Sequence, residues 1–426
     1  MKKYIPVIPI ADPFAWTPNP TWWDYKDIFK NDTPPEGFQK RAIFLYYDSG
    51  NTLSLHDVVS YQQGAYFRLS DEWEGLYNNN GSMYHTWNTD YDKPCDLGYN
   101  TRYCIVYTPI GQRDLNLGNL SSSDYNSILL AYIDDVNITN LYCSYTSIEA
   151  FITTKKTTAS NVDNWSGYSL SGRNLKYVVL PKGLKRLPSY FFERSAIREI
   201  ELPEGLEEIG NSCFYECFKL EKITFPNSLT KIGEYAFQYC MSLKEFKAPT
   251  SLKFIDRYAF YYCPSLEKIE LNEGLEYLGY DAFSCCSFRE ARLPSTLKHI
   301  SYFYNCWNLK KLILPEGLER IEIGVMNGTT PIGELKLPKS LTSMEGGIGN
   351  DYWLKKLIVD EGFVPPGTYF YIPSRLYISS LCEDFLRKLG DNKNNATIHL
   401  SYGNTGAVNT YDPTIIPELQ TKNYSI

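Results

Sequence analysis

Residues 226–248 read PNSLTKIGEYAFQYCMSLKEFKA, and the same pattern starts again at Pro249. Three apolar columns recur in phase along the chain, at spacings of 20 to 23 residues. The first column consists of Leu184, Leu206, Leu229, Leu252, Leu275, Leu297, Leu318 and Leu341. The second consists of Phe192, Phe214, Phe237, Phe260, Phe283 and Phe303, and the third of Cys217, Cys240, Cys263, Cys286 and Cys306. Columns in phase indicate one structural unit repeated along residues 175–360.

Each unit ends in a segment such as Leu220, Ile223 and Phe225, in which the last apolar positions alternate with polar ones. This alternation predicts a short strand with one buried face. Turn residues such as those at 203–205 follow it, and the A-F-x-x-C stretch has irregular or helix-like spacing. One unit cannot bury its own apolar face, so we expect the units to stack as a solenoid with parallel strands.

Charged residues alternate in sign at the outward position before each buried strand residue. They are Glu199, Lys222, Glu245, Lys268, Glu290, Lys311, Glu334 and Lys356. Neighbouring parallel strands lie about 4.8 Å apart, so stacking would bring opposite charges together. We interpret this charge ladder as a structural device that controls strand register. A random mixture of solvated charges is the alternative.

The pattern L-P-x-x-L-x-x-I-x-x-x-A-F-x-x-C-x-x-L-x-x-I resembles the BspA-like leucine-rich repeat family, known from bacterial surface proteins. The match covers residues 180–359 and weakens over 321–352, where the Phe and Cys columns are lost and glycines accumulate. The resemblance implies ligand binding or adhesion and no catalytic residues. The fold class expected is α+β: a leucine-rich-repeat solenoid with a parallel β-sheet, a small β-rich domain before it and a C-terminal cap.

The flanking segments do not repeat. Residues 1–40 carry many prolines together with Trp16, Trp22 and Trp23, a composition that favours an extended arm attaching to an assembly. Packing of this arm on its own domain is the alternative. The other expected divisions are a β-rich domain at 41–150, a linker or degenerate first repeat at 151–174, a cap at 361–402 and an extended tail at 403–426.

Composition argues against several function classes. The net charge is −7, and the basic residues are dispersed, so a nucleic-acid partner is not expected. The sequence contains no run of 18 apolar residues, so a membrane span is not expected. Residues 1–11 are not expected to form a signal peptide.

Candidate chemical sites are weak in this sequence. Four scattered histidines and repeat-phased cysteines predict no metal site, and no nucleotide-binding motif occurs, so no cofactor is expected. The acids Asp71, Glu72 and Glu74 around Trp73 are the weak candidate for an enzyme, since glycosidases use paired carboxylates.

Tyrosine is abundant, with 36 residues, and many lie beside the Phe column. Tyrosine is enriched at recognition surfaces because it offers a large, rigid contact area. The expected recognition surface consists of Tyr215, Tyr239, Tyr261, Tyr262 and Tyr304. The alternative is that these rings pack between turns.

These observations predict a non-enzymatic binding and structural protein whose repeats recognise a protein or a surface glycan. We favour a component of a phage-type virion or another assembly, on a virion surface that contacts a bacterial host. The alternative is a BspA-like adhesin on a bacterial cell surface, and the third hypothesis is an enzyme in the N-terminal domain.

Overall fold

The structure is a computed structural model. It describes residues 29–34, 36–47, 66–69, 74–77, 83–86, 101–117, 128–141, 148–159, 170–301, 303–321, 331–344, 354, 356–365, 369–372, 387–391, 397–400, 417 and 420–422. Trp16, Trp22, Trp23 and most of the expected cap and tail lie outside the described residues. The chain divides into two compact units, residues 1–206 and 207–426.

The first unit contains an eight-stranded sheet in the order β11-β9-β7-β1-β5-β2-β3-β4. A second sheet has the order β10-β8-β6. The strands are β1 (Phe38–Tyr47), β2 (Tyr66–Leu69), β3 (Glu74–Tyr77), β4 (Met83–Thr86), β5 (Thr101–Pro109), β6 (Asp114–Leu117), β7 (Ile128–Ile133), β8 (Asn137–Leu141), β9 (Ala150–Thr153), β10 (Thr158–Ala159), β11 (Tyr177–Val179), β12 (Arg186–Leu187) and β13 (Glu199–Glu201).

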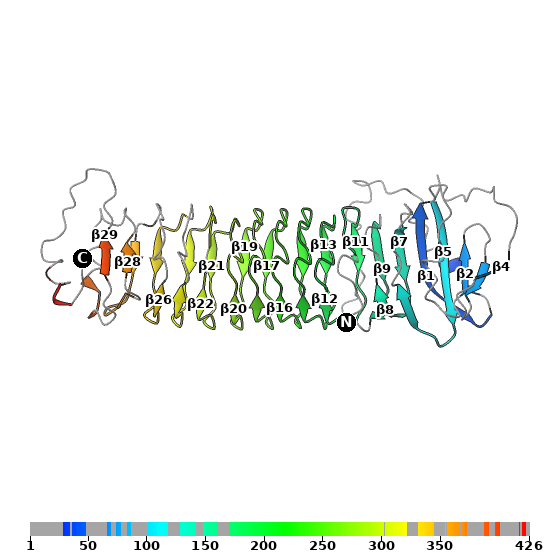
Figure 1. Cartoon of the computed structure of the whole chain (residues 1–426), viewed down its shortest axis with the longest axis horizontal. Coiled ribbons are helices and arrows are strands. Elements are labelled where there is room, and N and C mark those ends of the chain that lie inside the picture. The colour runs from blue at the N-terminus through cyan, green and yellow to red at the C-terminus, as the bar shows by residue number, and fades with distance from the viewer. Residues whose placement is uncertain are drawn as a thin grey trace. The chain divides into compact units, whose positions relative to one another are not determined.

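The large sheet changes from antiparallel to parallel at β7. Strand β1 pairs antiparallel with both β5 and β7, whereas β7, β9 and β11 pair in parallel. Figure 1 shows these strands side by side within the first unit. Strand β6 also pairs in parallel with β8. Parallel pairing therefore begins inside the segment expected as a separate β-rich domain, and it continues through β10 (Thr158–Ala159) in the segment expected as a linker or degenerate first repeat.

Residues before β1 contribute to the core of this sheet. Phe29 is buried against Ile43, Ile105 and Leu130, and its ring lies 5.4 Å from that of Tyr132. The segment expected as a free arm up to residue 40 thus includes residues that cover the sheet.

The second unit consists of repeated turns, and each turn carries two short strands. The front strands have three residues: β15 (Lys222–Thr224), β17 (Glu245–Lys247), β19 (Lys268–Glu270), β21 (Glu290–Arg292), β23 (Lys311–Ile313), β25 (Glu334–Lys336) and β27 (Lys356–Ile358). The back strands have two: β14 (Glu208–Ile209), β16 (Lys231–Ile232), β18 (Phe254–Ile255), β20 (Tyr277–Leu278), β22 (His299–Ile300), β24 (Arg320–Ile321) and β26 (Ser343–Met344). Strands β28 (Tyr369–Ile372) and β29 (Thr397–Leu400) pair in parallel after the last turn.

The columns read from the sequence form the core of these turns. Leu229, Phe237 and Cys240 are completely buried, and Phe237 stacks on Phe260 of the next turn with ring centroids 5.0 Å apart. The parallel solenoid predicted from the repeats is confirmed.

The third side of each turn is built from turns rather than helix. Tyr235 and Tyr239 have positive φ, so the backbone cannot continue as a right-handed helix between them. Alternate residues donate instead to the next turn: Phe237 N lies 2.7 Å from Ala259 O, and Tyr239 N lies 3.0 Å from Tyr261 O. Very little helix occurs among the described residues, chiefly at residues 29–31.

Candidate binding surfaces

Tyrosines form a connected cluster on the third side of the turns. The ring centroids of Tyr215 and Tyr239 are 5.9 Å apart, and those of Tyr239 and Tyr262 are 5.4 Å apart. Tyr215, Tyr239 and Tyr261 are only partly exposed, whereas Tyr262 and Tyr304 are 37% and 39% exposed. The five residues of the expected surface thus divide into three that pack against neighbours and two that face solvent.

Tyr261 is the most constrained member of this cluster. Burial, together with the neighbouring Cys285, raises the pKa of Tyr261 to about 12. Its hydroxyl therefore stays protonated over the physiological range and shares a hydrogen bond with the Cys285 side chain. Tyr261 therefore contacts Cys285 within the chain, in addition to any contact of its ring with a partner.

The thiol column lies behind the tyrosines, in the core. Cys240 donates to the carbonyl of Phe214 at 3.3 Å, and Cys263 donates to that of Phe237 at 3.2 Å. Cys286 and Cys306 make the same contact with Phe260 and Phe283. Burial raises the pKa of all four thiols. A buried, protonated thiol is a poor nucleophile and a poor metal ligand, so this geometry fits a structural role.

The front strands place the charge ladder in the expected register. Glu245 lies opposite Lys268, and Glu290 lies opposite Lys311. Lys311 Nζ is 2.7 Å from Glu290 Oε1, which is a direct ion pair. Lys268 Nζ instead lies 2.6 Å from Glu270 Oε1 on its own strand. Charged residues of the ladder therefore form ion pairs both with a residue on the neighbouring strand, as Lys311 does, and with a residue on their own strand, as Lys268 does.

Glu334 and Lys356 form the last described step of the ladder, in register and with their charged atoms 3.9 Å apart. Ion pairs between successive turns also occur in other columns. Lys244 pairs with Glu221 at 3.4 Å, and Lys253 pairs with Glu276 at 2.9 Å.

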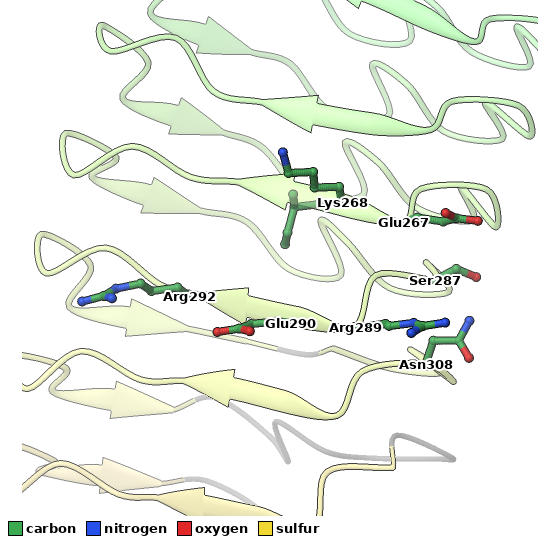
Figure 2. Close-up of a pocket in the computed structure, with 8 residues that line it drawn as sticks. Glu267, Lys268, Ser287, Arg289, Glu290, Arg292 and Asn308 are labelled. Carbon is green, nitrogen blue, oxygen red and sulfur yellow. The ribbon is translucent and has the colours of Figure 1, made fainter.

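A hollow of about 520 Å³ lies over the front strands between β19 and β21. Figure 2 shows Arg289 and Arg292 extending from opposite ends of β21, with Glu290 between them. The lining residues are Glu267, Lys268, Ile269, Ser287, Arg289, Glu290, Arg292 and Asn308. Seven of these eight residues are charged or polar, so the hollow suits a polar ligand.

The back strands carry an exposed aromatic row that sequence reasoning missed. Phe254 and Tyr277 lie opposite each other in register, and they are 40% and 47% exposed. The exposed His299 occupies the equivalent position on β22. The sequence does carry a signal for this row: Lys231 and Arg320 occupy the same position in other turns, so aromatic residues there depart from the charged residues of that column.

Other kinds of site find no support in the part of the chain that the structure describes. No group of three or more His, Cys, Asp or Glu side chains is placed to hold a metal ion there. The helices among those residues include none that is long and apolar enough to cross a membrane. Asp71, Glu72 and Trp73 lie outside the described residues.

Comparison with family models finds six copies of the BspA type leucine-rich repeat region, in matches over residues 161–269 and 230–348. A search of curated proteins found no match.

Among solved structures, the chain is similar to a leucine-rich repeat protein from T. pallidum, with 23% identity over 46% of this chain and 80% of that chain, at a TM-score of 0.33. A protein from Bacteroides ovatus shows 19% identity over 67% and 91% of the two chains, at a TM-score of 0.32. A leucine-rich cell surface protein from Faecalibacterium prausnitzii shows 15% identity over 78% and 94%, at a TM-score of 0.37.

Proposed function

Because residues 161–348 consist of BspA type leucine-rich repeats, we propose that this chain is a non-enzymatic binding protein whose repeats recognise a partner protein or glycan. The turns between Leu206 and Cys306 repeat the same buried columns, so these turns differ mainly in their exposed residues. Such a scaffold presents an extended row of side chains at nearly constant spacing.

The exposed tyrosines carry the proposal. Tyr262 and Tyr304 are more than one third exposed. Tyr262 also contacts the half-buried Tyr239, which lies beneath the exposed rim of the cluster. Rings held in place by neighbouring rings lose little conformational entropy on binding, which favours recognition.

Substitution of the exposed rings tests this role. The double variant Tyr262→Ser and Tyr304→Ser should reduce binding of the labelled protein to intact bacteria about tenfold, the loss expected from removing one recognition residue. Its melting temperature should stay within about 3 °C of wild type, because exposed rings contribute little to stability. Lys219→Ser, another exposed change in this unit, is the matched control. Unchanged cell binding by the double variant would refute the tyrosine surface.

We further propose that the protein is a component of a virion or another assembly and is attached through residues 1–28, with Trp16, Trp22 and Trp23 as anchors. The support is the composition of this segment, in which prolines restrict the backbone and three indoles supply apolar area. Mass spectrometry of purified particles should find the full chain. Finding it instead in a bacterial envelope fraction would favour the adhesin.

A further inference from the structure

The front strands of the second unit are joined in pairs rather than in one continuous sheet. Strand β17 pairs with β19, β21 with β23, and β25 with β27. Among the described residues, no strand ladder joins β19 to β21. The hollow lies at this interruption, since all of its lining residues except Asn308 come from the turns that carry these two strands.

Two charges in the hollow are already neutralised. Lys268 pairs with Glu270 at 2.6 Å, and Glu290 pairs with Lys311 at 2.7 Å. Each of these contacts lies within one hydrogen-bonded strand pair. Neither Lys268 nor Glu290 therefore contributes a free charge to a ligand.

Arg289 and Arg292 differ from these residues. Within the part of the chain that the structure describes, neither guanidinium has a carboxylate oxygen within 4.0 Å. Lys244, in the same column as Arg289, pairs with Glu221 of the preceding turn although β15 and β17 are not joined either, whereas Arg289 does not pair with Glu267. Arg292 occupies the same column as Glu270 of the preceding turn. Glu270 pairs with Lys247 and Lys268 rather than with Arg292. Among the described residues, Arg289, Arg292 and Glu267 thus lack an ion-pair partner within 4.0 Å, and the lining residues together carry one net positive charge. Hydrogen bonds from Ser295 and, at longer range, the charge of Arg292 lower the pKa of Glu273.

We propose that this hollow binds an acidic, extended peptide segment of a partner protein. Arginine is suited to this task because its planar guanidinium accepts a carboxylate through two parallel hydrogen bonds. The α-carbons of Arg289 and Arg292 are separated by three residues of nearly extended chain, about 10 Å. Two carboxylates placed two or three residues apart on an extended peptide span this length.

The remaining lining residues fit a peptide better than a sugar. Ser287 and Asn308 lie at the Arg289 end of the hollow and offer a hydroxyl and an amide to main-chain groups (Figure 2). None of the lining residues is aromatic, so the hollow offers no ring on which a sugar could stack. The inference rests on the proposed binding role of the repeats and adds the chemical class of one ligand, at a site separate from the exposed tyrosines.

Peptide selection tests the proposal. A displayed library of random linear peptides is selected on the full-length protein, with counter-selection on the double variant Arg289→Gln and Arg292→Gln. Selected peptides should carry two acidic residues two or three positions apart, and they should bind the double variant at least about tenfold more weakly. Lys310→Gln is the matched control, since Lys310 is exposed next to Arg289 but does not line the hollow.

Three outcomes overturn the proposal: no acidic enrichment, equal binding by the double variant, or arginine-dependent binding to a panel of uronic-acid oligosaccharides without peptide binding. The last would assign the hollow to a glycan. Matched melting temperatures establish that the double variant is folded, and single charge reversal at Arg289 provides a second test. Acidic peptides should still bind Tyr262→Ser and Tyr304→Ser, so failure of the tyrosine surface is distinguishable from failure of the hollow.

Discussion

The thiol column illustrates how one residue position serves five successive turns. Cys240 and Cys263 each fill a small space in the core and donate to the carbonyl of a phenylalanine in the preceding turn. Alanine would remove the thiol donor and leave each carbonyl only its backbone donor, the N–H of Cys217 or Cys240. A larger side chain would strain a core in which Phe237 is completely buried. Cysteine meets both requirements because it is small, apolar and a weak donor.

Stability should therefore fall in alkaline solution. Thiols of the unfolded chain titrate near their ordinary pKa of 9.0, whereas burial raises the pKa of Cys240 and Cys263 in the folded protein. Above this pH the unfolded chain holds fewer protons than the folded one. The free energy of unfolding then decreases as pH rises, by at most about 1.4 kcal/mol per pH unit for each thiol.

Urea unfolding from about pH 7 to about pH 10 measures this slope. Cys263→Ala should be less stable at neutral pH by about 1 to 2 kcal/mol and should show a shallower slope than wild type. Identical slopes would show that the thiol does not contribute.

At the scale of the elements, close approach between turns determines which residues the back strands tolerate. Gly279 follows β20, and its N–H donates to Ile255 O at 2.8 Å. A Cβ added to Gly279 would lie 2.3 Å from Arg257 N, a backbone atom that cannot rotate away. On the front strands, a charged residue pairs either with a residue of the joined neighbouring strand, as Lys311 does with Glu290, or with one on its own strand, as Lys268 does with Glu270.

Gly279→Ala should destabilise the second unit by about 2 to 3 kcal/mol, because the new methyl group overlaps the backbone of the preceding turn. Gly274→Ala is the matched control in the same turn. Its nearest contact would be 3.3 Å, to the amide nitrogen of Asn272. Thermal unfolding of both variants makes the comparison, and equal effects would contradict the argument from close approach.

Lys268→Glu tests the charge ladder. The change would place an acid beside Glu270 and opposite Glu245, so like charges would face each other within and across the strands. We expect a lower melting temperature in dilute buffer and partial recovery in high salt, since these groups are exposed and screened. Lys310→Glu, at an exposed lysine that makes no ion pair among the described residues, is the control. A wild-type melting curve for Lys268→Glu at low salt would refute the ladder.

At the scale of the whole molecule, the first unit determines how the chain enters the solenoid. Its sheet begins with antiparallel β1 and β5 and continues into parallel β7 and β9. Residues 29–32 are held against this sheet by hydrogen bonds. The Tyr107 hydroxyl donates to Asp32 at 2.7 Å, and Lys40 donates to the carbonyl of Phe29.

Truncation should distinguish the anchor segment from this covering segment. Removal of residues 1–24 should leave the melting temperature nearly unchanged and abolish incorporation into the native particle. Phe29→Ala should instead cost about 3 kcal/mol, since it empties a site in the core. Scanning calorimetry compares the two. A large loss of stability on removing residues 1–24 would show that they belong to the fold.

The sequence by itself determined the solenoid and its register. Leu229, Phe237 and Cys240 recur because every turn buries the same positions, and the same period places Glu245 opposite Lys268. These features repeat, so a single chain displays them several times over. Strand β29 (Thr397–Leu400) lies within the segment expected as a cap.

Only the tertiary structure decided which features depart from the repeat. Parallel pairing begins at β6 and β7, where the leucine, phenylalanine and cysteine columns are absent, because β6 pairs with β8 and β7 pairs with β1 and β9. Tyr239 and Tyr262 look alike in the sequence, yet their exposure differs because it depends on the neighbouring rings. The interruption between β19 and β21 depends on contacts between turns, which no residue spacing encodes, and only the structure shows that Arg289 and Arg292 lie beside it with no carboxylate within 4.0 Å among the described residues.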